Sequence, residues 1–193
     1  MRLYRPCAIG VISVAMLLIG CPPHNTVPYP ANPPDATPPD FLNIHGEAAG
    51  GGLAQDAGIF QPGVPPKPAL FIGPTGTLNL LASSGDQQSG IQTVLIVGQE
   101  KTCKWNGGGY TQVSYNGAKQ WAVQTNAPSS GTVPEQSYAQ TTVNVANELG
   151  TADRLELQFE TEATNFGTLT ASTAAISYFS TSATGKANPG SCP

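Results

Sequence analysis

Arg154-Leu-Glu-Leu-Gln-Phe-Glu-Thr161 is the stretch of this sequence that decides the fold class. Leu155, Leu157 and Phe159 alternate in it with polar residues, and a period of two is the pattern of a strand that is buried on one face. We therefore expect a β-strand whose other face, which carries Glu156 and Glu160, is exposed to solvent.

The same pattern, rich in Val, Ile, Thr and aromatic residues, begins near Pro68 and continues toward the end of the chain. The strands that it predicts are 70–73, 77–82, 91–97, 99–105, 111–115, 119–124, 137–146, 154–161 and 169–179. Turns are expected at Gly98 and at Asn116-Gly117, because Asn-Gly between alternating segments is a strong hairpin signal. Residues 139–149 leave a short helix as an alternative. Eight or so short strands predict one all-β domain over 68–193, an antiparallel β-sandwich.

The first 20 residues combine two arginines, an apolar run from Ala8 to Gly20 and small residues near its end. This is the layout of a secretory signal peptide, and the run is shorter than the roughly 20 residues of a membrane-spanning helix. Leu18-Ile19-Gly20-Cys21 resembles the lipobox of bacterial lipoproteins. The resemblance implies cleavage before Cys21 and attachment of acyl chains such as palmitate to that residue. The alternative is a plain signal peptide in which Cys21 begins a disulfide-bonded domain.

A lipidated Cys21 implies a protein of the bacterial cell envelope that is held to the membrane by lipid. In a Gram-negative cell the resemblance favours the outer membrane and leaves the inner membrane open. Residues 21–67 are rich in Pro and then in Gly, a composition that favours extended or flexible chain. We predict a disordered linker there, to which residues 41–44 or 58–60 could add a short edge strand.

Charge and cysteine content narrow the function classes. Without Arg2 and Arg5, the chain keeps 6 of its 8 basic residues and all 12 acidic ones, a net charge near −6. No block of Lys or Arg remains, so we expect no nucleic-acid partner. Cys103 and Cys192 are predicted to pair, as cysteines of exported proteins usually do. Free thiols are the alternative, and a zinc site is disfavoured because CxxC spacing and nearby histidines are missing.

The residues available for catalysis are few. Both histidines, His24 and His45, fall in the predicted linker, so a Ser-His-Asp or Cys-His site is not expected in the sandwich. Glu156 and Glu160, with Glu162 beyond, could act as a carboxylate pair in a hydrolase, but a solvated sheet face explains them more simply. Asp86 and Asp153 could ligate calcium, although neither lies in an Asp-rich spacing. Turn and strand-start roles fit them better. We predict no catalysis, no metal and no cofactor.

Aromatic residues gather around the segment Gly107-Gly108-Gly109, which lacks the Lys and Ser/Thr of a phosphate-binding loop. They are Trp105, Tyr110, Tyr115 and Trp121. Exposed aromatic side chains can stack on sugar rings or anchor a partner protein, whereas buried ones fill the core. These four are the candidate surface for contact with an envelope protein or polysaccharide. A structural envelope component without a ligand is the alternative.

A second resemblance concerns the fold. Ser89-Gly90-Ile91-Gln92-Thr93-Val94, followed by Leu-Ile-Val-Gly, is similar to the turn and apolar strand of bacterial immunoglobulin-like modules. Residues 162–167 fall where such modules often carry an Asp- and Asn-rich hairpin, and here the acidic and second Asn positions are missing. The similarity covers about 110 residues. It implies an immunoglobulin-like β-sandwich and no activity.

Overall fold

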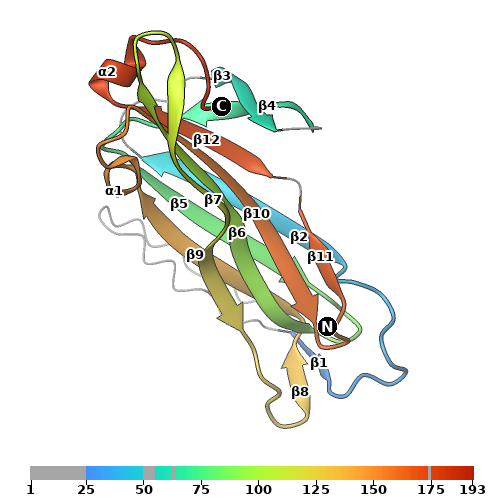
Figure 1. Cartoon of the computed structure of the whole chain (residues 1–193). Coiled ribbons are helices and arrows are strands. Elements are labelled where there is room, and N and C mark those ends of the chain that lie inside the picture. Colours follow the sequence, from blue (N-terminus) through green and yellow to red (C-terminus); the bar gives the residue numbers. More distant parts are fainter. Residues whose placement is uncertain (1–24, 50–54, 62–63, 174) are drawn as a thin grey trace.

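Strand β10 (Arg154–Asn165) runs through the middle of the larger of two packed sheets (Figure 1). It pairs antiparallel with β6 (Ile91–Trp105) on one side and with β12 (Ile176–Thr181) on the other. Leu155, Leu157 and Phe159 are buried, as their alternation predicts. The computed structural model describes residues 25–49, 55–61, 64–173 and 175–193. The proposed signal peptide and Cys21 lie outside these residues.

The larger sheet has the order β3-β4-β12-β10-β6-β7, with β11 paired to β10. Its other strands are β3 (Gln55–Gln61), β4 (Val64–Phe71), β7 (Tyr110–Thr125) and β11 (Thr170–Ser172). One neighbouring pair, β4 and β12, is parallel. In place of the single last strand predicted over 169–179, the structure has two strands, β11 and β12.

The smaller sheet consists of β2 (Phe41–Ala49), β5 (Thr77–Gly85) and β9 (Gln136–Asn144), all antiparallel. It forms the second layer of the sandwich (Figure 1). The two layers share one apolar core, to which β5 contributes Leu78 and Leu80 and β6 contributes Val94 and Ile96. The predicted all-β sandwich is confirmed. The immunoglobulin-like assignment within that class stays a prediction.

The predicted linker over 21–67 is wrong for its ordered part, and the edge strands that the sequence left open occur there: 41–44 lies in β2 and 58–60 in β3, each at the edge of its sheet. Strand β2 pairs along its whole length with β5, from Phe41 opposite Gly85 to Ala49 opposite Thr77. Leu42 and Ile44 pack against the core. β1 (Thr26–Pro28) pairs with β8 (Thr132–Pro134) at the end of the molecule opposite the chain's C-terminus (Figure 1). The sandwich therefore begins near residue 25 rather than at residue 68.

Two predicted turns are also wrong. β6 runs unbroken through Gly98, and β7 runs through Asn116-Gly117, so the two strands form one long hairpin. Its loop is Asn106–Gly109, where the Asn106 side-chain oxygen accepts the N–H groups of Gly108 and Gly109, both at 3.1 Å. Gly107 has φ +92°, which favours glycine. The Asn-Gly pair instead lies at a register shift of β7 against β6, a β-bulge.

Two short helices complete the described chain. α1 (Val145–Leu149) follows β9, and α2 (Ala183–Lys186) follows β12. The predicted alternatives over 137–149 thus both occur, as a strand followed by a helix. Neither of these helices is long and apolar enough to cross a membrane.

Candidate functional site

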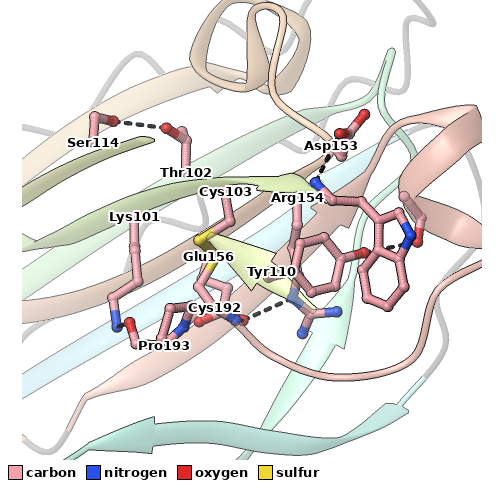
Figure 2. Close-up of a disulfide and its surroundings, with 12 residues drawn as sticks. Lys101, Thr102, Cys103, Tyr110, Ser114, Asp153, Arg154, Glu156, Cys192 and Pro193 are labelled. Carbon is pink, nitrogen blue, oxygen red and sulfur yellow. Dashed lines mark hydrogen bonds and ion pairs between the residues drawn. A yellow bond between two sulfur atoms is a disulfide. The ribbon is translucent and has the colours of Figure 1, made fainter. Parts of the chain in front are cut away.

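The C-terminal tail is fastened to the larger sheet by a disulfide, shown in Figure 2. Cys103 near the end of β6 is bonded to Cys192, with a Cα–Cα distance of 5.9 Å, and both residues are buried. Next to it, the Lys101 ammonium donates to the backbone oxygen of Pro193 at 2.9 Å. The predicted disulfide is confirmed. We call this region the disulfide corner: Cys103, Cys192, Asp153, Arg154 and Glu156.

A buried ion pair lies beside the disulfide. Arg154 Nε donates to Glu156 Oε1 at 2.7 Å, and the backbone N–H of Cys192 donates to the same oxygen at 2.8 Å. The Arg154 guanidinium lies 4.7 Å from the ring centroid of Phe179. The expectation that Glu156 lies on a solvated face is wrong, because the tail that carries Cys192 covers it. Glu160 and Glu162, farther along β10, are partly exposed.

Asp153 joins the hairpin to α2. Its carboxylate accepts the backbone N–H of Trp105 at 3.0 Å and the Ser182 hydroxyl at 3.1 Å. The Trp105 N–H holds the pKa of Asp153 below its ordinary value, against the effect of burial, with help from Ser182 and from the charge of Lys104. The carboxylate therefore organises the corner as a charged hydrogen-bond acceptor. This is the strand-start role that the sequence favours over calcium binding.

The four aromatic residues predicted to form one surface lie in different parts of the molecule. Trp105 and Tyr110 pack edge to face at the end of the hairpin, with ring centroids 5.3 Å apart. The Tyr110 hydroxyl donates to the carbonyl of Gly185 at 2.8 Å, and burial raises its pKa. These two rings therefore help to hold α2 and the tail in place, and both are only partly exposed.

The other two predicted aromatic residues have different roles. Trp121 packs against the core, with its ring centroid 5.1 Å from that of Phe159. Tyr115, with 51% of its surface accessible, is exposed on the edge strand β7. Its ring lies 5.7 Å from the Lys101 ammonium. The four residues thus do not form one contact surface, and the core alternative holds for Trp121.

An ionic cluster ties the hairpin to α1. The Lys119 ammonium bonds to the carboxylates of Glu100 on β6 and Glu148 on α1. Burial acts to lower the pKa of Lys119, but the two carboxylates raise it above its ordinary value. Burial raises the pKa of Glu100, with Glu148 adding to the effect and Lys119 opposing it. These three side chains therefore connect β6, β7 and α1.

A polar network closes the opposite end of the sandwich. The buried Asn165 side-chain amide donates to Asp35 at 2.8 Å and to Asp86 at 2.9 Å. Asp35 also accepts the Ser89 hydroxyl at 2.7 Å, and Asp86 accepts the Ser89 N–H at 2.7 Å. Asp86 thus has the turn role that the sequence favours. In the described part of the chain, no group of three His, Cys, Asp or Glu side chains could hold a metal ion.

The outer face of the smaller sheet is the surface that sequence reasoning missed. Phe41 and Tyr138 are exposed on it, with 43% and 42% of their surfaces accessible. The Phe41 ring covers Gly85 in the middle strand, where a Cβ would collide with it. Tyr138 on β9 donates its hydroxyl to the Gln136 side chain at 2.9 Å. Both rings therefore stand on paired strands beside polar side chains.

Strict alternation in two segments could have revealed this face. In residues 41–49, exposed positions alternate with partly buried ones, and in residues 136–144 Ser137, Ala139 and Val143 are buried between exposed polar residues. The prolines before residue 41 and the glycines after residue 49 concealed the first segment as linker. His45, also assigned to the linker, lies on this exposed face.

Comparison with known proteins adds no relative: no family model, curated protein or solved structure matches this chain.

Proposed function

We propose that this chain is a lipid-anchored, non-catalytic protein of the bacterial cell envelope that works by binding another envelope or extracellular molecule. The observation that carries the binding part is the outer face of the smaller sheet. Phe41 projects from β2 and Tyr138 from β9, on either side of β5, so the surface is built from regular structure. Rings held on strands lose little conformational freedom when they contact a ligand, and this favours binding.

The proposed site replaces the surface expected from the sequence. Trp105, Tyr110 and Trp121 are committed to contacts within the fold, whereas the rings of the smaller sheet are free to meet a partner. Glu156, the first carboxylate of the alternative hydrolase site, is occupied by Arg154 and the backbone of Cys192. These contacts favour binding over hydrolysis as the function of the sandwich.

The anchor part of the proposal rests on Leu18-Ile19-Gly20-Cys21. Thr26, where β1 begins, follows Cys21 by five residues, which can span at most about 18 Å. A lipid on Cys21 would therefore hold the β1–β8 end of the sandwich close to the membrane. The outer face of the smaller sheet would then be available to molecules next to that membrane.

The experiment compares two double variants of the full-length chain, purified in detergent. Phe41→Ala with Tyr138→Ala removes both rings of the smaller sheet. Val113→Ala with Tyr115→Ala removes exposed side chains of β7 and is the matched control. Co-sedimentation with detergent-extracted cell envelopes, which hold no bilayer for the proposed lipid to enter, should be lost in the first variant and kept in the second. Because all four side chains are exposed, both variants should keep the thermal midpoint of the parent chain. Equal sedimentation of the two variants would contradict the proposal.

A further inference from the structure

We infer that the outer face of the smaller sheet binds a neutral glycan chain. This inference rests on the proposed function and names the ligand class of that same site. It follows from three properties of the face: its aromatic rings, its amide side chains and its low charge.

The aromatic rings have a defined support. β2 and β9 flank β5, so Phe41 and Tyr138 belong to strands on opposite sides of Gly85. Because Gly85 has no side chain, the Phe41 ring lies over the middle strand. The bond to Gln136 directs the Tyr138 ring toward the residue that pairs with Gly85. A sugar ring presents a C–H face, and such a face packs on an aromatic ring.

Amide side chains lie along the same face, from the rings at one end of the sheet to the other end. Five lie on this face across the three strands: Asn43, Asn79, Gln136, Gln140 and Asn144. Each amide offers both donors and an acceptor, as hydroxyl groups of sugars do, so the two sets of groups can pair in either direction. Thr142 already donates its hydroxyl to Asn79 at 2.8 Å, which fixes one of these amides.

The low charge of this face indicates which class of glycan it can bind. Each of the three strands places five residues on this face, and Glu47 is the only Asp, Glu, Lys or Arg among them. A polyanionic glycan would find no Lys or Arg on these strand positions, and a polycation would find a single carboxylate. The face therefore matches a neutral polymer. The nine-residue length of β2 corresponds to roughly 30 Å, which accommodates several sugar units in a row.

The test measures binding of the full-length chain to cellohexaose and to the hexamer of N-acetylglucosamine, with polygalacturonate as the acidic comparison. We expect saturable binding to at least one neutral hexamer and none to polygalacturonate. Phe41→Ala with Tyr138→Ala should weaken that binding roughly tenfold or more, because each stacked ring contributes measurably to affinity. The control Val113→Ala with Tyr115→Ala should bind as the parent chain does.

Two further readouts locate the ligand. His45 lies on the same face, so its ring signals in an NMR spectrum should move when the hexamer is added. Gly85→Ala should displace the Phe41 ring and weaken binding while the chain stays folded, since a ring can move aside more easily than backbone. Unchanged His45 signals with bound hexamer would place the ligand elsewhere and overturn the inference.

Failure of the inference is distinguishable from failure of the proposed function. If envelope binding depends on Phe41 and Tyr138 but disappears when envelopes are treated with protease, and neither hexamer binds, the partner is a protein. The proposed function then stands and the glycan inference falls. A dimer of the parent chain that the Phe41→Ala, Tyr138→Ala variant disrupts would instead assign this face to a second copy. If envelopes do not bind the parent chain at all, both proposals fail.

Discussion

Gly98 shows at the scale of one residue why a glycine does not always mark a turn. It lies within β6, opposite Phe159 of β10. A Cβ at this position would collide with the backbone carbonyl of Gln158. The residue is therefore required by the close approach of two central strands.

Gly98→Ala should accordingly destabilise the sandwich. The atoms in the way belong to the backbone, so we expect a loss of about 1–3 kcal/mol in the free energy of unfolding, measured by urea denaturation. Gly109→Ala is the control, because no atom lies within 4 Å of a Cβ built there. It should change stability by less than about 0.5 kcal/mol. Equal midpoints for the two variants would show that the strands can separate to accept a methyl group.

Asp35 carries the pH dependence of the polar network. Burial acts to raise the pKa of Asp35, but hydrogen bonds from Ser89 and from the backbone and hydroxyl of Thr37 outweigh it and lower the pKa. A carboxyl with a lower pKa in the folded state stabilises the fold fully above its unfolded pKa of about 4. That contribution is lost as the pH falls through the folded value.

Asp35→Ala should therefore lower the thermal midpoint at neutral pH. The difference from the parent chain should shrink below about pH 4, as followed by circular dichroism at a series of pH values. Glu47→Gln, which changes an exposed carboxyl on β2, should leave the neutral-pH midpoint nearly unchanged. A difference between Asp35→Ala and the parent chain that stays constant down to pH 3 would contradict the assigned role.

At the scale of elements, the sequence predicts strands better than it predicts their ends. The alternation around Leu157 predicts β10 correctly, because the apolar side chains of that strand pack in the core. The turn signal at Asn116-Gly117 fails because the loop at residues 106–109 closes the hairpin first, and the partner strand then extends past Asn116. The Asn116-Gly117 pair alone cannot show which of the two glycine-containing segments forms the turn, because strand pairing over a longer range decides this.

The site was less predictable than the fold. Disulfide pairing of Cys103 with Cys192 followed from counting cysteines in a chain that we expect to be exported. The separation of Trp105 on β6 from Trp121 on β7 did not, because it depends on which face each residue presents after the three register shifts between these strands. Burial of Glu156 depends on the tail, which reaches it from 36 residues away. Such contacts are tertiary, and neither periodicity nor composition encodes them.

The tail is the element whose attachment can be tested most directly. Replacing both Cys103 and Cys192 with Ser removes a link across 89 residues, with an expected stability loss of up to about 4–5 kcal/mol. Carboxypeptidase should then digest the tail of the variant faster than that of the parent chain, as seen by mass spectrometry. Val113→Ala with Tyr115→Ala, which changes exposed side chains of β7 and leaves the disulfide intact, is the control. Equal protection of both tails would show that Lys101 and Glu156 hold the tail without the disulfide.

At the scale of the whole molecule, the two outer faces of the sandwich differ. The larger sheet is covered at one end by the tail and α2 (Figure 1), whereas the rings of the smaller sheet are exposed. β1 and β8 lie at the end opposite the tail. A chain anchored just before β1 would therefore present its disulfide corner away from the membrane and the face of the smaller sheet sideways.

The anchor itself is testable in living bacteria. Cys21→Ser should abolish incorporation of a radioactive fatty acid and leave the unprocessed chain, because the lipobox resemblance implies that the Cys21 thiol is the acceptor of the lipid. Cys7→Ser is the matched control: it also removes one thiol, but from within the proposed signal peptide, so it should be labelled like the parent chain. Equal labelling of the two variants would contradict the anchor. Loss of label in Cys21→Ser, with envelope binding of the purified protein unchanged, would show that the lipid sets the position of the sandwich and that the folded domain carries the binding.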